Sequence, residues 1–216
     1  VHVGSLLAVI YYFRDDILAM TKSLFQSNNL YIDERLLAVL LIIATIPIVF
    51  VGFFGSDLIN ENRSNVNSVA YMNLIFAGFL FFAYLYSSAS KTLVELTIMG
   101  AIFIGVFQVF SLLPGASRSG TAMTAALLIG LNLKDASKFA FLLSIPTILG
   151  ALFFLFIEIS ASNYSLNFNS LFIGFITSFV IAFLTIKYFL IFVDKIGMYP
   201  FVIYRIILGC ILLLLI

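Results

Sequence analysis

Apolar segments of near-spanning length alternate with short polar connections along almost the whole chain. The apolar segments cover residues 36–55, 69–86, 94–113, 119–133, 139–157, 170–192 and 201–216. A helix needs ~20 predominantly apolar residues to cross the hydrocarbon core of a bilayer, and most of these segments approach that length. The pattern therefore predicts an all-α, polytopic integral membrane helix bundle.

The segment 119–133 is too short to span the membrane. A helix of about 15 residues, at ~1.5 Å per residue, is roughly 22 Å long against ~30 Å of hydrocarbon. It follows a polar break, "PGASRSG", inside an otherwise apolar run. Irregular backbone at membrane depth is tolerated only where it is buried in protein or lines a wet cavity. We therefore expect a re-entrant half-helix whose turn lies in a pocket below the membrane surface.

Composition confirms the membrane class and excludes several partners. Hydrophobic residues make up 63% of the chain, charged residues 10%, and the mean hydropathy is +1.19, which excludes a water-soluble globule. A net charge of +1 offers no basic surface for nucleic acid. The chain has one cysteine, Cys210, and one histidine, His2, so an intramolecular disulfide is excluded and a Cys/His zinc site is not expected. Any metal would be a hard cation held by oxygen atoms.

The chain opens at Val1 with an apolar stretch of only about a dozen residues, where ~20 are needed to span. We expect the sequence to begin in mid-helix. Residues 1–216 would then form a single transmembrane domain whose first helix lies upstream of Val1.

Lysine and arginine residues orient the bundle, because positive side chains are retained in the cytoplasm. One side carries Arg14, Lys22, Arg35, Lys91, Lys134, Lys138, Lys187 and Lys195, and the other carries only Arg63 and Arg118. The first side is therefore predicted to be cytoplasmic. Because Lys91 and Lys134 both lie inside, the chain between them goes outward and returns, with the polar break at the outer end of the excursion.

The polar break combines the elements of an anion site. Pro114 ends the preceding helix, and Gly115 permits a backbone turn that is closed to other residues. Ser117 or Ser119 can cap the helix that starts near Gly120, whose free N–H groups and positive dipole end face the turn. Arg118 adds a planar fork of donors, and this set fits a phosphate or diphosphate better than a carboxylate.

A structural interpretation of the same residues stays open at this point. Arg118 could snorkel to the interface while Pro-Gly forms an ordinary turn. Gln108 could hydrogen-bond the same pocket or only a neighbouring helix. Arg205 lies within ~9 Å of the start of its helix, so snorkelling toward the cytoplasm is the favoured interpretation there.

Two stretches, "GVFQVFSLLPGASRSGTAMTAALLIGL" and "DASKFAFLLSIPTILGALFF", resemble the undecaprenyl-diphosphate phosphatase family of the bacitracin-resistance type. The resemblance extends to both ends of the chain. It implies an integral enzyme of inverted repeats with two re-entrant regions in the bacterial cytoplasmic (inner) membrane. Its active site would face the periplasm and remove one phosphate from undecaprenyl diphosphate, so that the monophosphate carrier is reused for cell-wall synthesis.

The resemblance also implies roles for particular residues. Arg118, Ser117 and Ser119 are the candidate catalytic residues, and Gly115, Gly120, Thr121 and Gln108 the candidate substrate-binding residues. A divalent cation, Mg²⁺ or Ca²⁺, would be held by acidic residues of a first motif that belongs upstream of Val1, so the chain alone is expected to be inactive or unstable. The family often has Thr where this chain has Ala122. The substrate and membrane lipid are the expected partners, and a homodimer is one possible assembly.

A transporter is the rival hypothesis. Half-helices that meet around an anion-binding turn are also the design of secondary carriers, and such a protein could flip the lipid monophosphate instead of hydrolysing the diphosphate. Hydrolysis requires a base or metal ligands close to Arg118, whereas translocation does not.

Overall fold

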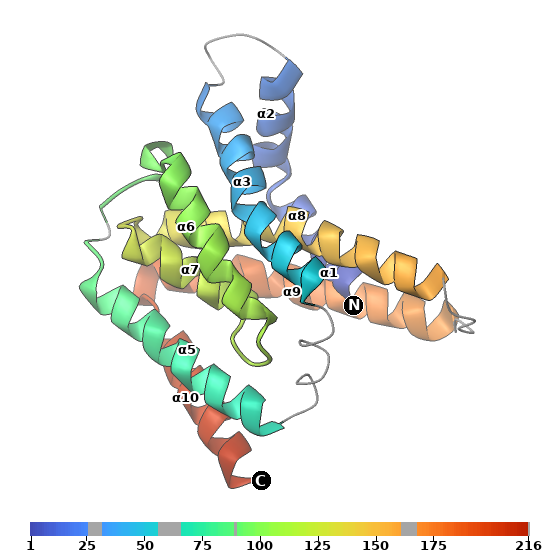
Figure 1. Ribbon diagram of the computed structural model, residues 1–216, viewed down its shortest axis with the longest axis vertical. Coiled ribbons are helices and arrows are strands. Elements are labelled where there is room, and N and C mark those ends of the chain that lie inside the picture. The colour runs from blue at the N-terminus through green and yellow to red at the C-terminus, as the bar shows by residue number, and fades with distance from the viewer. Residues whose placement is uncertain (26–31, 56–65, 89, 161–167, 216) are drawn as a thin grey trace.

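The computed structural model describes residues 1–25, 32–55, 66–88, 90–160 and 168–215, and Figure 1 shows the arrangement of their helices. These residues form α1 (His2–Tyr12), α2 (Arg14–Phe25), α3 (Ile32–Phe54), α5 (Val66–Tyr86), α6 (Ile98–Gln108), α7 (Arg118–Leu128), α8 (Leu133–Ser160), α9 (Phe168–Ile196) and α10 (Tyr199–Leu214), with short 3₁₀ helices η2 (Leu93–Glu95) and η3 (Val109–Leu112). Within the described ranges there is no strand beyond one isolated bridge between Lys91 and Leu131. The prediction of an all-α bundle is confirmed.

Four helices are long and apolar enough to cross a membrane. They are Asp33–Phe54 of α3, Val66–Tyr86 of α5, Leu133–Ile157 of α8 and Phe168–Ile196 of α9. Their most apolar windows are mostly not buried inside the molecule, as expected for helices that face lipid. The protein is therefore a multi-pass membrane protein. The implied inverted repeat stays a prediction.

The predicted span 94–113 is wrong as a continuous helix. Thr97 accepts a hydrogen bond from the Gly100 N–H at 3.1 Å and starts α6 at Ile98. Leu113 is extended, as expected before a proline, and the helix has already tightened into η3. Because α6 has 11 residues, it is only about 16 Å long.

Helices α6 and α7 form a re-entrant hairpin, since both are too short to span. The segment before α6 and the segment after α7 are joined by backbone hydrogen bonds. The Lys91 N–H donates to the Gly130 carbonyl at 3.0 Å, and the Asn132 N–H donates to the Lys91 carbonyl at 2.8 Å. The Ser87 hydroxyl donates to the Leu127 carbonyl at 2.7 Å in the same region. The polar break therefore lies at the opposite end of the hairpin, as a turn inside the protein.

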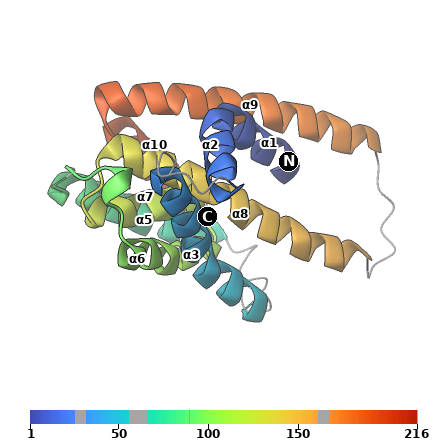
Figure 2. The same cartoon turned by 90° about the horizontal axis from the view of Figure 1, so that it is seen from above.

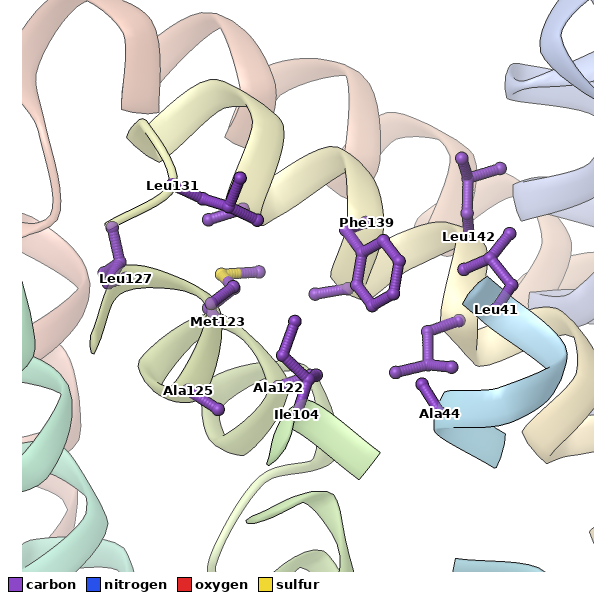
Figure 3. Close-up of a cluster of buried hydrophobic side chains, with 14 of the residues drawn as sticks. Leu41, Ala44, Ile104, Ala122, Met123, Ala125, Leu127, Leu131, Phe139 and Leu142 are labelled. Carbon is purple, nitrogen blue, oxygen red and sulfur yellow. The ribbon is translucent and has the colours of Figure 1, made fainter. Parts of the chain in front are cut away.

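Helix α7 lies at the centre of the core. Every residue from Gly120 to Leu127 is buried. Figure 3 shows Met123 of α7 beside Phe139 of α8, with Ile104 of α6 and Ala44 of α3 around them. The small residues of α7 allow this crowding, because they let neighbouring backbones approach closely.

The lysines near the open end of the hairpin share one end of the bundle. Lys138 of α8 pairs with Asp16 of α2, and Lys134 pairs with Asp194 of α9 at 3.9 Å. Asn132 donates to the Asp135 carboxylate at 2.9 Å. This agrees with the predicted grouping of Lys134 and Lys138, whereas Arg63 lies outside the described residues. Figure 2 shows that α8 and α9 diverge away from this end.

We predict that Gly105→Ala destabilises the α3–α6 contact. A Cβ at Gly105 would overlap the backbone of Ala44, which cannot move aside as a side chain can. Overpacking of this kind costs about 1–3 kcal/mol, so the midpoint of thermal unfolding in detergent should fall. Gly78→Ala is the matched control, because nothing lies within 4 Å of its added Cβ. An unchanged midpoint for Gly105→Ala would contradict the close approach.

Candidate functional site

The turn between η3 and α7 has an unusual backbone. Gly115 has φ of +93° and Ser117 has φ of +68°, and Ser117 is the one non-glycine residue with positive φ in the described ranges. A Cβ at Gly115 would overlap the backbone of Val69 on α5, so only glycine fits there. A serine in this region is strained, and such strain persists only where the surrounding structure holds it. The predicted turn role of Gly115 is confirmed.

Ser117 caps α7, as predicted for one of the two serines. Its hydroxyl oxygen accepts a hydrogen bond from the Gly120 N–H at 3.3 Å, and its carbonyl accepts one from the Thr121 N–H at 2.9 Å. The N–H groups of Arg118 and Ser119 have no acceptor among the described residues. These two free N–H groups lie at the positive end of the helix dipole.

A cavity of about 570 Å³ adjoins this helix end. Arg118 and Ser119 form one wall, and α1, α8 and α9 form the others. The further lining residues are Val1, Ser5, Val9, Ala140, Phe141, Ser144, Ile148, Gly174, Thr177, Ser178, Ile181, Ala182, Thr185 and Ile186. Of the residues that line it in the described structure, Arg118 is the only one with a charged side chain. Its guanidinium has neither a hydrogen bond nor an ion pair within the described ranges.

Most hydroxyl groups in the cavity wall already donate to their own helices. Ser144 donates to the Phe141 carbonyl, and Thr177 donates to the Ile173 carbonyl. These oxygens therefore offer lone pairs rather than protons to a ligand. The free donors of the described cavity are concentrated at Arg118 and Ser119, which favours an anion at that end and apolar groups elsewhere.

Arg205 does not snorkel toward water, so the interpretation favoured from sequence is wrong. Its side chain is only 3% exposed. The Nε donates to Asn73 Oδ1 at 2.8 Å, and Nη2 donates to the carbonyls of Gly115 at 3.0 Å and Ala116 at 3.2 Å. The guanidinium turns inward because the turn offers it carbonyl oxygens at the same depth. Sequence reasoning missed Asn73, although it is the only amide side chain in the apolar segment 69–86.

The remaining predicted residues are placed as follows. Gly120 lies in the first turn of α7 beside Arg118. Thr121 is fully buried, and its hydroxyl donates to the Arg118 carbonyl at 2.8 Å. Gln108 donates to the Thr147 hydroxyl on α8 at 3.0 Å and does not line the cavity, although its Oε1 has no partner in the described ranges. Their roles in substrate binding stay predictions.

The described residues do not form a divalent-cation site. No group of three or more His, Cys, Asp or Glu side chains is close enough to hold a metal ion in the ranges that the structure covers. No carboxylate lines the described cavity either. A metal ion at this site therefore stays a prediction from the resemblance.

Comparison with known proteins gives a consistent result. A family model described as bacitracin resistance protein BacA matches residues 1–211. A protein of Alcanivorax borkumensis named undecaprenyl-diphosphatase is 40% identical over 215 residues, covering 99% of this chain and 81% of the relative. A protein of Alteromonas mediterranea with the same name is 42% identical over 216 residues, covering 99% and 81%.

We predict that Ser117→Gly is more stable than Ser117→Ala. Loss of the serine cap costs about 1 kcal/mol in the alanine variant and only about a few tenths in the glycine variant. Glycine also relieves the positive φ, which costs other residues roughly 1–2 kcal/mol. Thermal unfolding in detergent measures the order. Ser119→Ala is the control, since Ser119 is not the cap and its change should stay within about 0.5 kcal/mol. The reverse order of the two Ser117 variants would exclude strain at this residue.

Proposed function

The chain belongs to the family of bacitracin resistance protein BacA, and we propose that the turn around Arg118 is where it hydrolyses undecaprenyl diphosphate. The reaction releases undecaprenyl phosphate and inorganic phosphate. The observation that carries the proposal is a guanidinium without a partner among the described residues, beside two free helix N–H groups, in a cavity whose other walls carry only apolar groups and hydroxyls. An anion with a lipid tail fits a cavity that has its donors at one end and mainly apolar walls elsewhere.

The terminal phosphate binds where these donors converge. Arg118 makes a two-pronged contact with phosphate oxygens, and the N–H groups of Arg118 and Ser119 hold a further oxygen. These donors stabilise the negative charge on the equatorial oxygens as the bond between the terminal phosphorus and the bridging oxygen breaks. The apolar walls from α8 and α9 contact the polyprenyl chain.

Ser117 and Ser119 position the phosphate rather than attack it. Ser117 already serves as the helix cap, and no His, Asp or Glu that could activate a serine lines the described cavity. The attacking oxygen comes from water, which becomes part of the released inorganic phosphate. The described residues thus supply binding and charge stabilisation.

The transporter hypothesis has no specific support. Both relatives carry the name of a hydrolase, and no observation on the described residues favours a carrier over a phosphatase. We therefore keep translocation of the lipid monophosphate only as an outcome of the assay below.

The protein acts in the bacterial cytoplasmic membrane with its site facing the periplasm. The shared end of Lys134 and Lys138 supports this orientation, because positive residues favour the cytoplasm and α7 runs from the turn toward that end. Release of the monophosphate on the outer side returns the carrier for cell-wall synthesis. Assembly into a homodimer stays a prediction, and no role with nucleic acid is proposed.

Arg118→Ala should lower phosphate release from undecaprenyl diphosphate by at least about a hundredfold, since losing one such donor typically costs 10²–10³ in rate. The rate of phosphate release by Arg118→Lys should lie between those of wild type and Arg118→Ala, because lysine keeps the positive charge but lacks the planar fork of donors. Released inorganic phosphate is measured with the complete protein in detergent. Arg14→Ala is the control, because Arg14 is exposed and contacts Tyr11 and Asp15 outside the cavity.

Wild-type activity in Arg118→Ala would move the site away from the turn. A folded wild-type protein that releases no phosphate but moves lipid monophosphate across vesicle membranes would replace the phosphatase by the carrier.

Removal of divalent cations tests the cofactor separately. We expect a chelator to abolish phosphate release and added Mg²⁺ or Ca²⁺ to restore it, because a hard cation suits oxygen ligands and diphosphate. The same phosphate assay measures both steps. Full activity in the chelator would remove the metal from the proposal and leave Arg118 as the principal charge at the phosphate.

A further inference from the structure

Arg205 is a buried charge without a counter-ion in the described structure. It lies on α10, is 3% exposed, and forms no ion pair with any described carboxylate. Its acceptors are one amide oxygen and two backbone carbonyls. A charged group inside a membrane protein is costly, and such groups mark functional regions. The positive charge of Arg205 is therefore available to the region around the turn.

Asn73 fixes the guanidinium in one direction. Its Oδ1 accepts from Arg205 Nε, while its Nδ2 donates to the Arg205 backbone carbonyl at 2.6 Å. Both ends of the arginine are thus held from α5, which lies alongside α10 in Figure 1. This reciprocal pair leaves the outer nitrogens of the fork to contact the turn.

The fork holds the strained part of the backbone. Nη2 donates to two successive carbonyls, those of Gly115 and Ala116, which stand between the two residues with positive φ. A planar guanidinium suits such paired acceptors better than a lysine does. Arg205 therefore opposes relaxation of the turn that presents Arg118.

The remaining nitrogen lies behind the first turn of α7. Nη1 is buried and has no hydrogen-bond partner among the described atoms. A Cβ added at Gly120 would lie 2.9 Å from Nη1 and 3.1 Å from the Ser117 hydroxyl oxygen. Gly120 thus lets the guanidinium approach the helix end, where its charge adds to the positive end of the dipole.

We propose that Arg205 is a positioning residue for the phosphate site, which clamps the Pro-Gly turn and places a fixed positive charge behind the N-terminus of α7. The proposal rests on the proposed function, because it assigns this second arginine to the same site. It acts through the turn and α7, whereas Arg118 contacts the substrate directly.

The test compares Arg205→Met, Arg205→Lys and Val202→Ala in the complete protein. Val202 is buried on α10 about one turn earlier, so its truncation weakens the packing of the same helix without removing the charge. We measure kcat, KM and the inhibition constant of inorganic phosphate on folded protein. We expect kcat/KM of Arg205→Met to fall about tenfold to a hundredfold, because small misplacements at a site cost this much.

The phosphate inhibition constant separates the clamp from the charge. It should rise in Arg205→Met and stay near wild type in Arg205→Lys, which keeps the charge, while Arg205→Lys still loses kcat because it lacks the fork. Val202→Ala should lower the unfolding midpoint but leave the kinetics of the folded fraction within about twofold. Wild-type kinetics in Arg205→Met, or equal kinetic losses in Arg205→Met and Val202→Ala, would overturn the proposal.

A double-mutant cycle covers the case in which Arg205→Met does not fold. Gly120→Ala pushes against Nη1, so it should lower kcat strongly in the wild type and less in the Arg205→Lys background, where the side chain is slimmer. Additive losses would exclude the contact. If Arg118→Ala is inactive and the Arg205 variants behave like wild type, the role of Arg205 is refuted but the proposed function stands. If Arg118→Ala keeps its activity, the proposed function itself is refuted.

Discussion

The turn at the tip of the α6–α7 hairpin must find partners for its backbone polar groups within the protein. In a membrane protein an unsatisfied carbonyl or N–H group costs several kcal/mol, and irregular backbone survives only if the protein supplies the partners. Here Arg205 supplies donors for Gly115 and Ala116, and Ser117 supplies an acceptor for the Gly120 N–H. One face of the turn is thereby saturated, and the free donors remain on the cavity face.

Much of the surrounding architecture follows from this requirement. For Arg205 to reach the turn, α10 must pass close to the first turn of α7, and Gly120 leaves room for it. Asn73 then ties α10 to α5, and Gly115 lets α5 approach the turn on the same side. At the other end, backbone hydrogen bonds between Lys91 and the residues after α7 close the hairpin. The short helix is held at both ends.

The features that depend only on residues close together along the chain were predictable from sequence. The shortness of the helix after the polar break, the glycine at position 115 and the serine cap of α7 follow from local rules, and the structure has all three. The predicted end at residue 133 is wrong, because α7 ends at Leu128 and Gly130, with φ of +93°, turns the chain into α8. The division of 94–113 was missed because hydropathy does not register the Thr97 cap or the extended residue before Pro114. Hydropathy measures transfer into lipid, whereas helix ends are set by hydrogen bonds.

Arg205 shows why the remainder could not be predicted. Snorkelling was inferred from its distance to the end of its own helix, but its acceptor at Gly115 is 90 positions away in the sequence. Whether a guanidinium turns to water or inward depends on which carbonyls the tertiary fold brings to its depth. The same applies to Gln108, which is near the turn in sequence but bonds to Thr147 on α8.

The two arginines have the same side-chain chemistry but differ in burial and in the acceptors that the protein offers them. Arg205 donates hydrogen bonds from Nε and Nη2 to protein oxygens, and its Nη1 lies beside the first turn of α7 without a partner among the described residues. Arg118, in contrast, donates no side-chain hydrogen bond to a described residue and lines the cavity. Neither is neutralised by a carboxylate in the described ranges. Donors fixed before a ligand arrives do not have to reorganise when charge develops, which is the main source of electrostatic catalysis. A rigid, strained turn behind Arg118 is therefore suited to phosphoryl transfer, whereas a carrier must release its anion on the far side and gains nothing from holding it so firmly.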